Sequence, residues 1–263
     1  MANAGVMKIA AMADLHVSKS PPDGLQAVLT QAASEADVLL LGGDLTDYGL
    51  IEEAQVLARL LASIQIPKLA VLGNHDYESN QEAEVLRILT DAGVKSIDGD
   101  SIEINGVGFA GVKGFAGGFG TGTLAPWGEQ AIKIFVKEAL DEALKLERAL
   151  ARLRTPHRIA LLHYSPIQGT VEGEPVAIFP FLGTSRLEEP IERLGVTAVF
   201  HGHAHRGTPE GHTKSGIPVF NVALPLLRRR FPDRPPYHLH VIELRSAAHE
   251  AIEPQSAQPA AAD

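Results

Sequence analysis

The sequence predicts a layered α/β fold, in which strands pack between helices. Short apolar runs typical of strands alternate along the chain with segments whose apolar residues recur at helical spacing. The 263 residues are 45% hydrophobic and 21% charged, which is the profile of a globular protein. Many α/β domains contain about 200–250 residues. We therefore expect one domain over residues 1–245.

The first half of the chain alternates strictly between the two kinds of segment. Strands are expected where apolar runs are short and continuous, and helices where residues such as Ile51, Ala54 and Leu57 share one face. The expected order is strand 6–13, helix 22–35, strand 37–41, helix 51–61 and strand 68–72. This β-α-β-α-β order favours a layered sheet with functional loops at the strand ends.

The second half begins with a hairpin and a long helix. Asn105 and Gly106 form a turn dipeptide between two short strands, and a Gly-rich stretch at 114–122 leads into a helix at about 128–153. Further strands are expected at 158–162, 198–201, 218–222 and 238–244. Residues 246–263 are rich in Ala, Pro, Gln and Glu without apolar periodicity, so we predict a disordered C-terminal tail.

The net charge and the N-terminal sequence limit the expected cellular location and binding partners. The formal net charge of −9 opposes nonspecific binding to nucleic acid. The chain starts with a short apolar run that ends at Asp14, which fits neither a signal peptide nor a membrane span, so we expect a cytoplasmic protein without a membrane partner. The basic run at 227–231 is expected to be an exposed loop with solvated arginines.

Polar side chains follow five of the predicted strands, at the point where each strand ends. These residues are Asp14, His16, Asp44, Asn74, His75, Asp76, His163, His203 and His205. In an extended segment residues i and i+2 point to the same side, so Asp14 with His16, and His203 with His205, are each expected to converge on one ion. Gly43, Gly73 and Gly202 suit a sharp turn or a close approach of the backbone to a ligand.

Each of these features has an ordinary structural explanation when it is taken alone. A single histidine after a strand is usually a hydrogen-bonded core or surface residue, Gly-Asp is usually a turn, and Asn-His-Asp can cap a helix. Together they indicate a metal site, because charged and imidazole groups at the ends of buried strands cost free energy unless they are paired or bind a metal. The chain has no cysteine, so nitrogen and oxygen are the available ligand atoms.

The five polar blocks resemble the motif pattern of the calcineurin-like metallophosphoesterases, which is Asp-x-His, Gly-Asp, Gly-Asn-His-Asp/Glu, a separate His, and Gly-His-x-His. All five blocks occur in this order between Asp14 and His205, about three quarters of the chain. The resemblance implies a four-layer sandwich of two mixed β-sheets flanked by helices. It also implies a binuclear metal site where the strand ends meet.

The resemblance further implies a role for each residue of the blocks. One metal ion would be held by Asp14, His16, Asp44 and His205, and the other by Asp44, Asn74, His163 and His203, with Asp44 as the bridge. His75 would contact the substrate phosphate. We predict His75 and Asp76 as the catalytic residues, with the Asp76 carboxylate orienting the His75 ring.

The implied activity is hydrolysis of a phosphate ester by water activated between two divalent cations. Mn, Fe and Zn are the expected ions, since sites of nitrogen and oxygen accept several metals. We expect a small-molecule phosphodiester as the substrate, because two ions, a bridging hydroxide and two aspartates sum to roughly +1, which suits a monoanion. The alternatives are a phosphomonoesterase, a nuclease and a noncatalytic scaffold. The Gly-Asn-His-Asp block is similar to the bacterial branch of the cyclic-nucleotide phosphodiesterases.

Other polar and aromatic residues lie outside the five blocks. His157, His212 and His249 are expected in loops or the tail, His238 and His240 share one face of a strand, and His201 either supports a ligand or packs at a strand end. Lys113 and Arg206 are candidates for contact with the substrate phosphate. Apolar surface for a leaving group is offered by Phe115, Phe119, Phe179 and Phe181.

Overall fold

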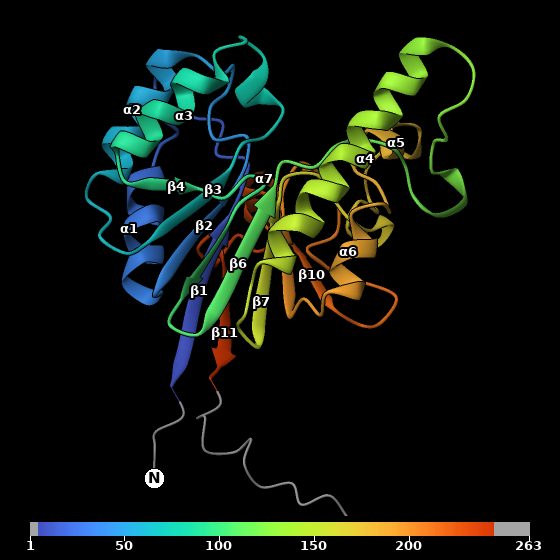
Figure 1. Ribbon diagram of the computed structural model, residues 1–263. Helices are drawn as coiled ribbons and strands as arrows, with labels where there is room; N and C mark the ends of the chain where they lie inside the picture. The colour runs from blue at the N-terminus through green and yellow to red at the C-terminus, as the bar shows by residue number, and fades with distance from the viewer. Residues whose placement is uncertain (1–4, 245–263) are drawn as a thin grey trace, which may run out of the picture.

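The computed structural model describes residues 5–244, which form two β-sheets packed between helices (Figure 1). The first sheet has the order β11-β1-β2-β3-β4 and consists of β1 (Val6–Met12), β2 (Val38–Gly42), β3 (Lys68–Val71), β4 (Val94–Ser96) and β11 (His238–Glu243). The second has the order β5-β6-β7-β8-β10-β9 and consists of β5 (Ser101–Ile104), β6 (Val107–Val112), β7 (His157–Leu162), β8 (Ala198–His201), β9 (Glu210–His212) and β10 (Pro218–Asn221).

Helices cover the outer faces of both sheets (Figure 1). The first sheet carries α1 (Leu25–Glu35), α2 (Ile51–Leu61) and α3 (Glu82–Asp91), and the second carries α4 (Gln130–Ala151) and α6 (Glu188–Arg193). Shorter helices are η1 (His75–Tyr77), η2 (Gly120–Gly122), η3 (Gln168–Thr170), η4 (Val176–Ile178), α5 (Phe179–Leu182) and α7 (Leu224–Arg230). The predicted four-layer α/β sandwich is confirmed.

Three layers of buried side chains explain why the central strands are apolar on both faces. In β2, Leu39 and Leu41 pack against α1 and α2, whereas Val38 and Leu40 pack against the second sheet. A third apolar layer joins the second sheet to residues such as Leu146 of α4. A strand buried on both faces reads as a continuous apolar run, which is the pattern by which the strands were predicted.

Parallel pairing brings the functional loops to one end of the molecule. β1, β2 and β3 are parallel to one another, and so are β6, β7, β8 and β10. A backbone hydrogen bond connects the carboxyl ends of the two sets, in which Ala13 N–H donates to the Val222 carbonyl at 3.0 Å. The polar blocks of both sheets therefore meet between the sheets at their carboxyl end.

Several local expectations differ from the structure. α1 starts at Leu25 rather than at residue 22, because Gly24 has a φ of 77° and breaks the helix. The basic run 227–231 lies largely in α7 and not in a loop, since Leu226 and Leu227 are buried while the arginines stay exposed. His157 begins β7 and His212 ends β9, so neither lies in a loop.

Parts of the chain were not anticipated or are not described. α3 and β4 were missing from the predicted order. The domain boundary at residue 245, the predicted tail 246–263 and His249 lie outside the described residues. None of the helices within 5–244 has the length and apolar character that a membrane span requires.

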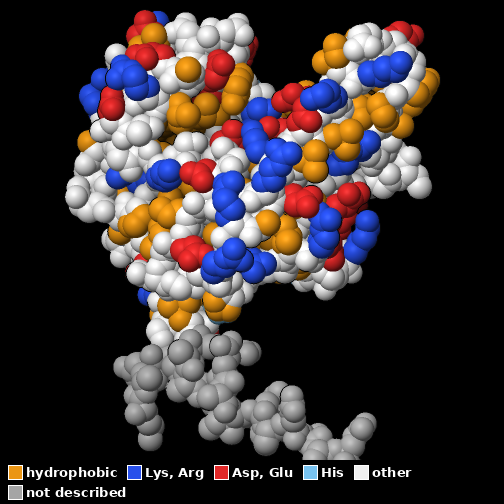
Figure 2. All heavy atoms as spheres, viewed as in Figure 1, with side chains coloured by type: hydrophobic (Ala, Val, Ile, Leu, Met, Phe, Trp, Pro, Cys, Tyr) orange, Lys and Arg blue, Asp and Glu red, His pale blue; other side chains and the backbone are white. Residues whose placement is uncertain are grey.

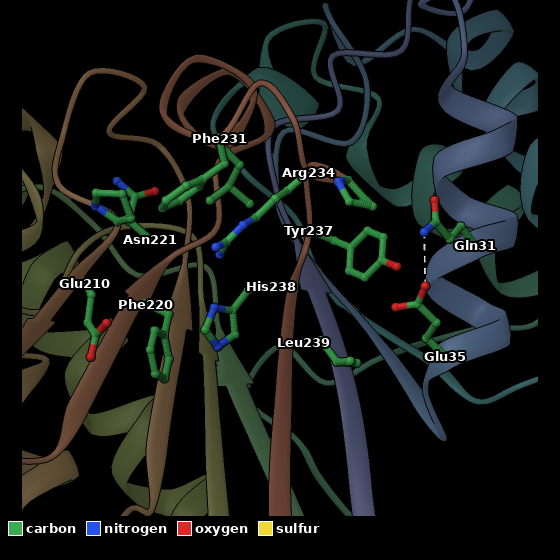
Figure 3. A pocket seen from close by; sticks show the side chains of 13 residues that line it. Gln31, Glu35, Glu210, Phe220, Asn221, Phe231, Arg234, Tyr237, His238 and Leu239 are labelled. Carbon is green, nitrogen blue, oxygen red and sulfur yellow. Dashed lines mark hydrogen bonds between the residues drawn. The ribbon is translucent and has the colours of Figure 1, made fainter.

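A cavity of about 500 Å³ lies between β10, β11 and the end of α1, and none of the candidate metal ligands lines it (Figure 3). Its wall includes His238, whose ring stacks on Phe220 with a centroid distance of 4.1 Å. Burial lowers the pKa of His238 to about 4. His238 and His240 share a strand face as predicted, and they pack against aromatic rings there.

Candidate metal centre

The loop after each of five strands contributes to one cluster of polar side chains. Asp14 and His16 follow β1, and Asp44 follows β2. Asn74 follows β3, His163 follows β7, and His203 and His205 follow β8. Asp14, Asp44 and His163 are almost completely buried, whereas the other ligand candidates are partly exposed. Such a set of buried carboxylates and imidazoles needs charge partners.

The first group of ligand atoms comes from Asp14, His16, Asp44 and His205, and these atoms all lie within 4.8 Å of one another. His205 Nε2 is 2.9 Å from Asp14 Oδ1 and 3.4 Å from His16 Nε2. His16 Nε2 is 3.8 Å from Asp44 Oδ2. Ligands bound at about 2.0–2.2 Å to one ion are spaced in this range, so the group fits one divalent cation.

The second group consists of Asp44, His163 and His203. His163 Nε2 lies 3.4 Å from Asp44 Oδ1 and 2.9 Å from Asn74 Oδ1, which adds an amide oxygen. Asp44 is common to both groups, with one carboxylate oxygen toward His16 and the other toward His163. This arrangement is what a bridging carboxylate between two ions requires.

The expectation that His203 and His205 face one ion is wrong, because their ring nitrogens belong to different groups. The backbone is not extended at these blocks, so alternation in the sequence does not fix which way a side chain points. Asp14, His16, Asp44 and His203 have φ values of 57°, 43°, 47° and 69°. Residues other than glycine rarely adopt this left-handed conformation, and such strain concentrates at functional sites.

Two glycines allow the loops to approach the carboxylates. A Cβ on Gly73 would lie 2.2 Å from Asp44 Oδ1, and a Cβ on Gly202 would lie 2.2 Å from Asp14 Oδ2. Neither distance is compatible with a side chain. Both positions therefore require glycine for a steric reason, as the sequence predicted.

Hydrogen bonds select which ring nitrogen of each histidine is free. His163 Nδ1 is 2.9 Å from the Gly42 carbonyl, so this nitrogen carries the proton. The unprotonated Nε2 then has a lone pair on the side of the Asp44 and Asn74 oxygens, as a metal ligand does. His203 Nε2 donates to the Phe181 carbonyl at 3.1 Å, which leaves Nδ1 free. Carbonyl partners of this kind fix the ring orientation of metal-binding histidines.

Burial and neighbouring charges shift the pKa values of the ligand candidates in different directions, and they favour the neutral ring for His16 and His203. Burial lowers the pKa of His203 to about 3, and burial also lowers the pKa of His16. Burial alone would raise the pKa of Asp14, but the hydrogen bond from His205 and the neighbouring rings bring it to about 2. Burial raises the pKa of Asp44, which is the cost that a cation at this position would offset.

A sequence profile of the calcineurin-like phosphoesterases matches residues 7–207. The chain belongs to this family. A curated relative, a probable cyclic nucleotide phosphodiesterase of Vesicomyosocius okutanii subsp. Calyptogena okutanii (strain HA), is 28% identical over 177 residues. The match covers 65% of this chain and 63% of that relative, so it leaves over a third of the relative's length unmatched.

Solved structures share the fold of this calcineurin-like chain. Phosphopantetheinyl hydrolase from Mycobacterium tuberculosis has a TM-score of 0.63 at 14% identity, over 96% of this chain and 98% of that one. The protein TT1561 of Thermus thermophilus has a TM-score of 0.53 at 17% identity, over 92% of this chain and all of that one. At these identities the likeness shows the fold.

His75 lies at the edge of the first ligand group of this family member, with its ring centroid 4.6 Å from that of His16. Its Nδ1 donates to the Asp47 carbonyl at 2.7 Å, which leaves Nε2 free. Although burial alone would lower it, the pKa of His75 is raised by the Asp47 carbonyl and by the carboxylates of Asp44, Glu78 and Asp47. The ring is therefore suited to donate a proton or a hydrogen bond.

Asp47 is a residue that the sequence analysis missed. Its carboxylate oxygen lies 3.4 Å from His16 Nδ1, while its backbone carbonyl accepts from His75. One residue thus orients a predicted ligand and the predicted catalytic histidine. Its position three residues after Asp44 is the signal that could have found it.

The role predicted for Asp76 is wrong, because its carboxylate does not contact the His75 ring. Asp76 is fully buried and accepts hydrogen bonds from Leu45 N–H at 3.1 Å, Thr46 N–H and hydroxyl at 2.8 and 2.6 Å, and Gly73 N–H at 2.8 Å. Burial raises its pKa, and these donors oppose that rise. Asp76 therefore links the loop after β2 to the loop after β3 through hydrogen bonds.

The remaining candidates divide between packing and the rim of the site. His201 is fully buried between the Gly202 carbonyl and the Thr170 hydroxyl, each at 2.8 Å, so it packs at the strand end. Arg206 is exposed. The predicted apolar wall is mostly buried or half-buried, at Phe115, Phe119 and Phe179, and Phe181 is 58% exposed.

Proposed function

We propose that this chain is a phosphodiesterase that hydrolyses a small-molecule phosphate ester with two divalent metal ions. The observation that carries the proposal is the pair of ligand groups that share Asp44. Membership of the calcineurin-like phosphoesterases supports the same reaction.

The donor set fits two ions of the Mn, Fe or Zn type. Asp14, His16, Asp44 and His205 would hold one ion, and Asp44, Asn74, His163 and His203 would hold the other. When bound, two such ions supply an acidified water and an electrophilic clamp on the phosphate. His75 would donate to a phosphoryl oxygen or to the leaving group, and the Asp47 carbonyl holds its ring for that purpose.

A diester is favoured over a monoester by charge and by the curated relative. Two divalent ions against the carboxylates of Asp14 and Asp44 leave a modest positive charge, which suits a monoanionic phosphate. The relative from Vesicomyosocius okutanii is named a probable cyclic nucleotide phosphodiesterase. Phe181 adds exposed aromatic surface beside His203, whose Nε2 donates to the Phe181 carbonyl.

The test uses protein stripped with a chelator and reloaded with Mn, Fe or Zn. We expect hydrolysis to return with reloading and about two metal ions per chain by elemental analysis. The values of kcat/KM for bis-p-nitrophenyl phosphate and p-nitrophenyl phosphate are then compared under one metal and pH. A clear preference for the monoester overturns the diesterase assignment, and full activity in the stripped protein overturns the metal mechanism.

A further inference from the structure

Lys113 lies at the carboxyl end of β6, on the side of the second ligand group. Its backbone carbonyl accepts from His163 N–H and Tyr164 N–H at 3.1 Å each. The Tyr164 ring separates the lysine from the metal centre, with its centroid 4.5 Å from that of His203 and 5.4 Å from that of His163. The lysine is therefore one ring away from predicted metal ligands.

Three aromatic rings surround the lysine ammonium. Lys113 Nζ is 5.0 Å from the ring centroid of Phe115, 5.4 Å from that of Tyr164 and 5.5 Å from that of Tyr77. All three distances are within the range of cation–π attraction. Tyr77 ends the short helix that starts at His75, so the rings that hold the ammonium come from both sides of the site.

The ammonium has no carboxylate partner among residues 5–244, where no Asp or Glu oxygen lies within 4.0 Å of Nζ. One of its three donors is used, by the Gly114 carbonyl at 2.9 Å. Three carboxylates lie in its neighbourhood, of which Glu138 is exposed while Glu142 and Asp98 are engaged by Lys145. Glu142 pairs with Lys145 at 2.5 Å and accepts from Gly114 N–H, and Asp98 pairs with Lys145 at 2.9 Å.

A half-buried cation with free donors beside a phosphate site lacks the charge partner that its desolvation requires. Figure 2 shows Lys and Arg side chains, with Asp and Glu side chains beside them, at the base of the hollow between the lobe of α2 and α3 and the projecting end of α4. A phosphate group fits this position well, because its charge and its acceptor oxygens match a compact ammonium.

We propose that Lys113 is a specificity-determining residue that binds a second phosphate group of the substrate, carried on the part of the diester that does not react. The inference rests on the proposed phosphodiesterase function and narrows its substrate class to phosphodiesters with an additional phosphate.

The experiment compares two chromogenic substrates that differ by one phosphate. They are thymidine 5′-(p-nitrophenyl phosphate) and the same compound with a 3′-phosphate, assayed with the metal-loaded full chain. We expect wild type to prefer the 3′-phosphorylated compound by kcat/KM, and Lys113→Met to reduce this preference about tenfold to a hundredfold through KM. Lys113→Arg, which keeps the charge, should retain part of the preference.

Lys95→Met is the matched control, because it removes the same charge from an exposed ion pair with Asp100. It should leave the substrate ratio unchanged. The ratio cancels any shared effect of Lys113→Met on folding or metal content, which elemental analysis monitors. An unchanged ratio in Lys113→Met, with hydrolysis of both compounds, overturns the inference alone. A wild-type protein that hydrolyses neither compound overturns the proposed function and this inference with it.

Discussion

Replacing Asp76 with Asn should destabilise the chain without removing any metal ligand. In its more favourable orientation, the introduced side-chain amide would still accept hydrogen bonds from Leu45 N–H and Gly73 N–H through its oxygen, while its NH2 group would face Thr46. The Thr46 hydroxyl can reverse and accept, but the Thr46 N–H loses its acceptor. One buried unsatisfied N–H costs about 1–3 kcal/mol, and loss of charge from the other bonds costs about 1 kcal/mol more. We expect a loss of about 2–4 kcal/mol.

The assay is urea unfolding of the metal-free protein, so that stability is measured apart from metal binding. Because Asp76 joins the loops that carry Asp44 and Asn74, we also expect weaker metal binding by titration calorimetry. The pH–rate profile of residual activity should keep the shape of wild type, since Asp76 does not contact the His75 ring.

Glu78→Gln is the control for stability alone, because it removes one carboxylate from the same segment at an exposed position, whereas its charge also raises the pKa of His75. Its effect on stability should stay within about 0.5 kcal/mol. The reasoning fails if Asp76→Asn unfolds within that same margin, or if it shifts the pH–rate profile while stability is unchanged.

Three further predictions concern the ligands and the buried histidine. Gly73→Ala should lower the free energy of unfolding by about 1–3 kcal/mol and lower the metal content, because the new Cβ would lie 2.2 Å from Asp44 Oδ1. Gly122→Ala, which has open space around it, should change neither quantity in unfolding and elemental analysis. Asp44→Asn should deplete both metals, whereas His75→Ala should keep them and slow turnover about a hundredfold to ten-thousandfold; metal loss in His75→Ala would contradict its role. Burial lowers the pKa of His201 from 6.5 to about 4, so the unfolded chain takes up a proton first on acidification. This residue should contribute about 3 kcal/mol to the loss of metal-free stability between these pH values, beside the contributions of His203 and His238. His201→Gln should reduce the slope of stability against pH in unfolding curves by that share, and a slope equal to that of wild type would assign the loss to the other groups.

The sequence predicted the central strands because they are buried on both faces and therefore read as continuous apolar runs, whereas the short, partly exposed strands β4 and β9 were missed. Leu39 and Leu41 face helices while Leu40 faces the other sheet, and all three are apolar for the same reason. α7 was missed because its buried leucines are few and the neighbouring arginines dominate the local pattern. A periodicity argument needs more turns than this helix has.

From the sequence alone, the order of the polar blocks determined the family, which the profile match confirms. The same blocks, the glycines between them and the absence of cysteine predicted the reaction class and the kinds of ligand atom. Tertiary structure decided which side chains share a group. The backbone is left-handed at His203 and also at Asp14 and His16, and alternation in sequence predicts direction only for an extended backbone. It therefore gave the right grouping for Asp14 with His16 and the wrong one for His203 with His205. Only the folded structure shows that Asp76 binds backbone N–H groups instead of the His75 ring, and that the Asp47 carbonyl contacts that ring. The aromatic rings around Lys113 are likewise visible only in the folded structure. These contacts join loops from different strands, and their geometry depends on the packing of two sheets rather than on any local pattern.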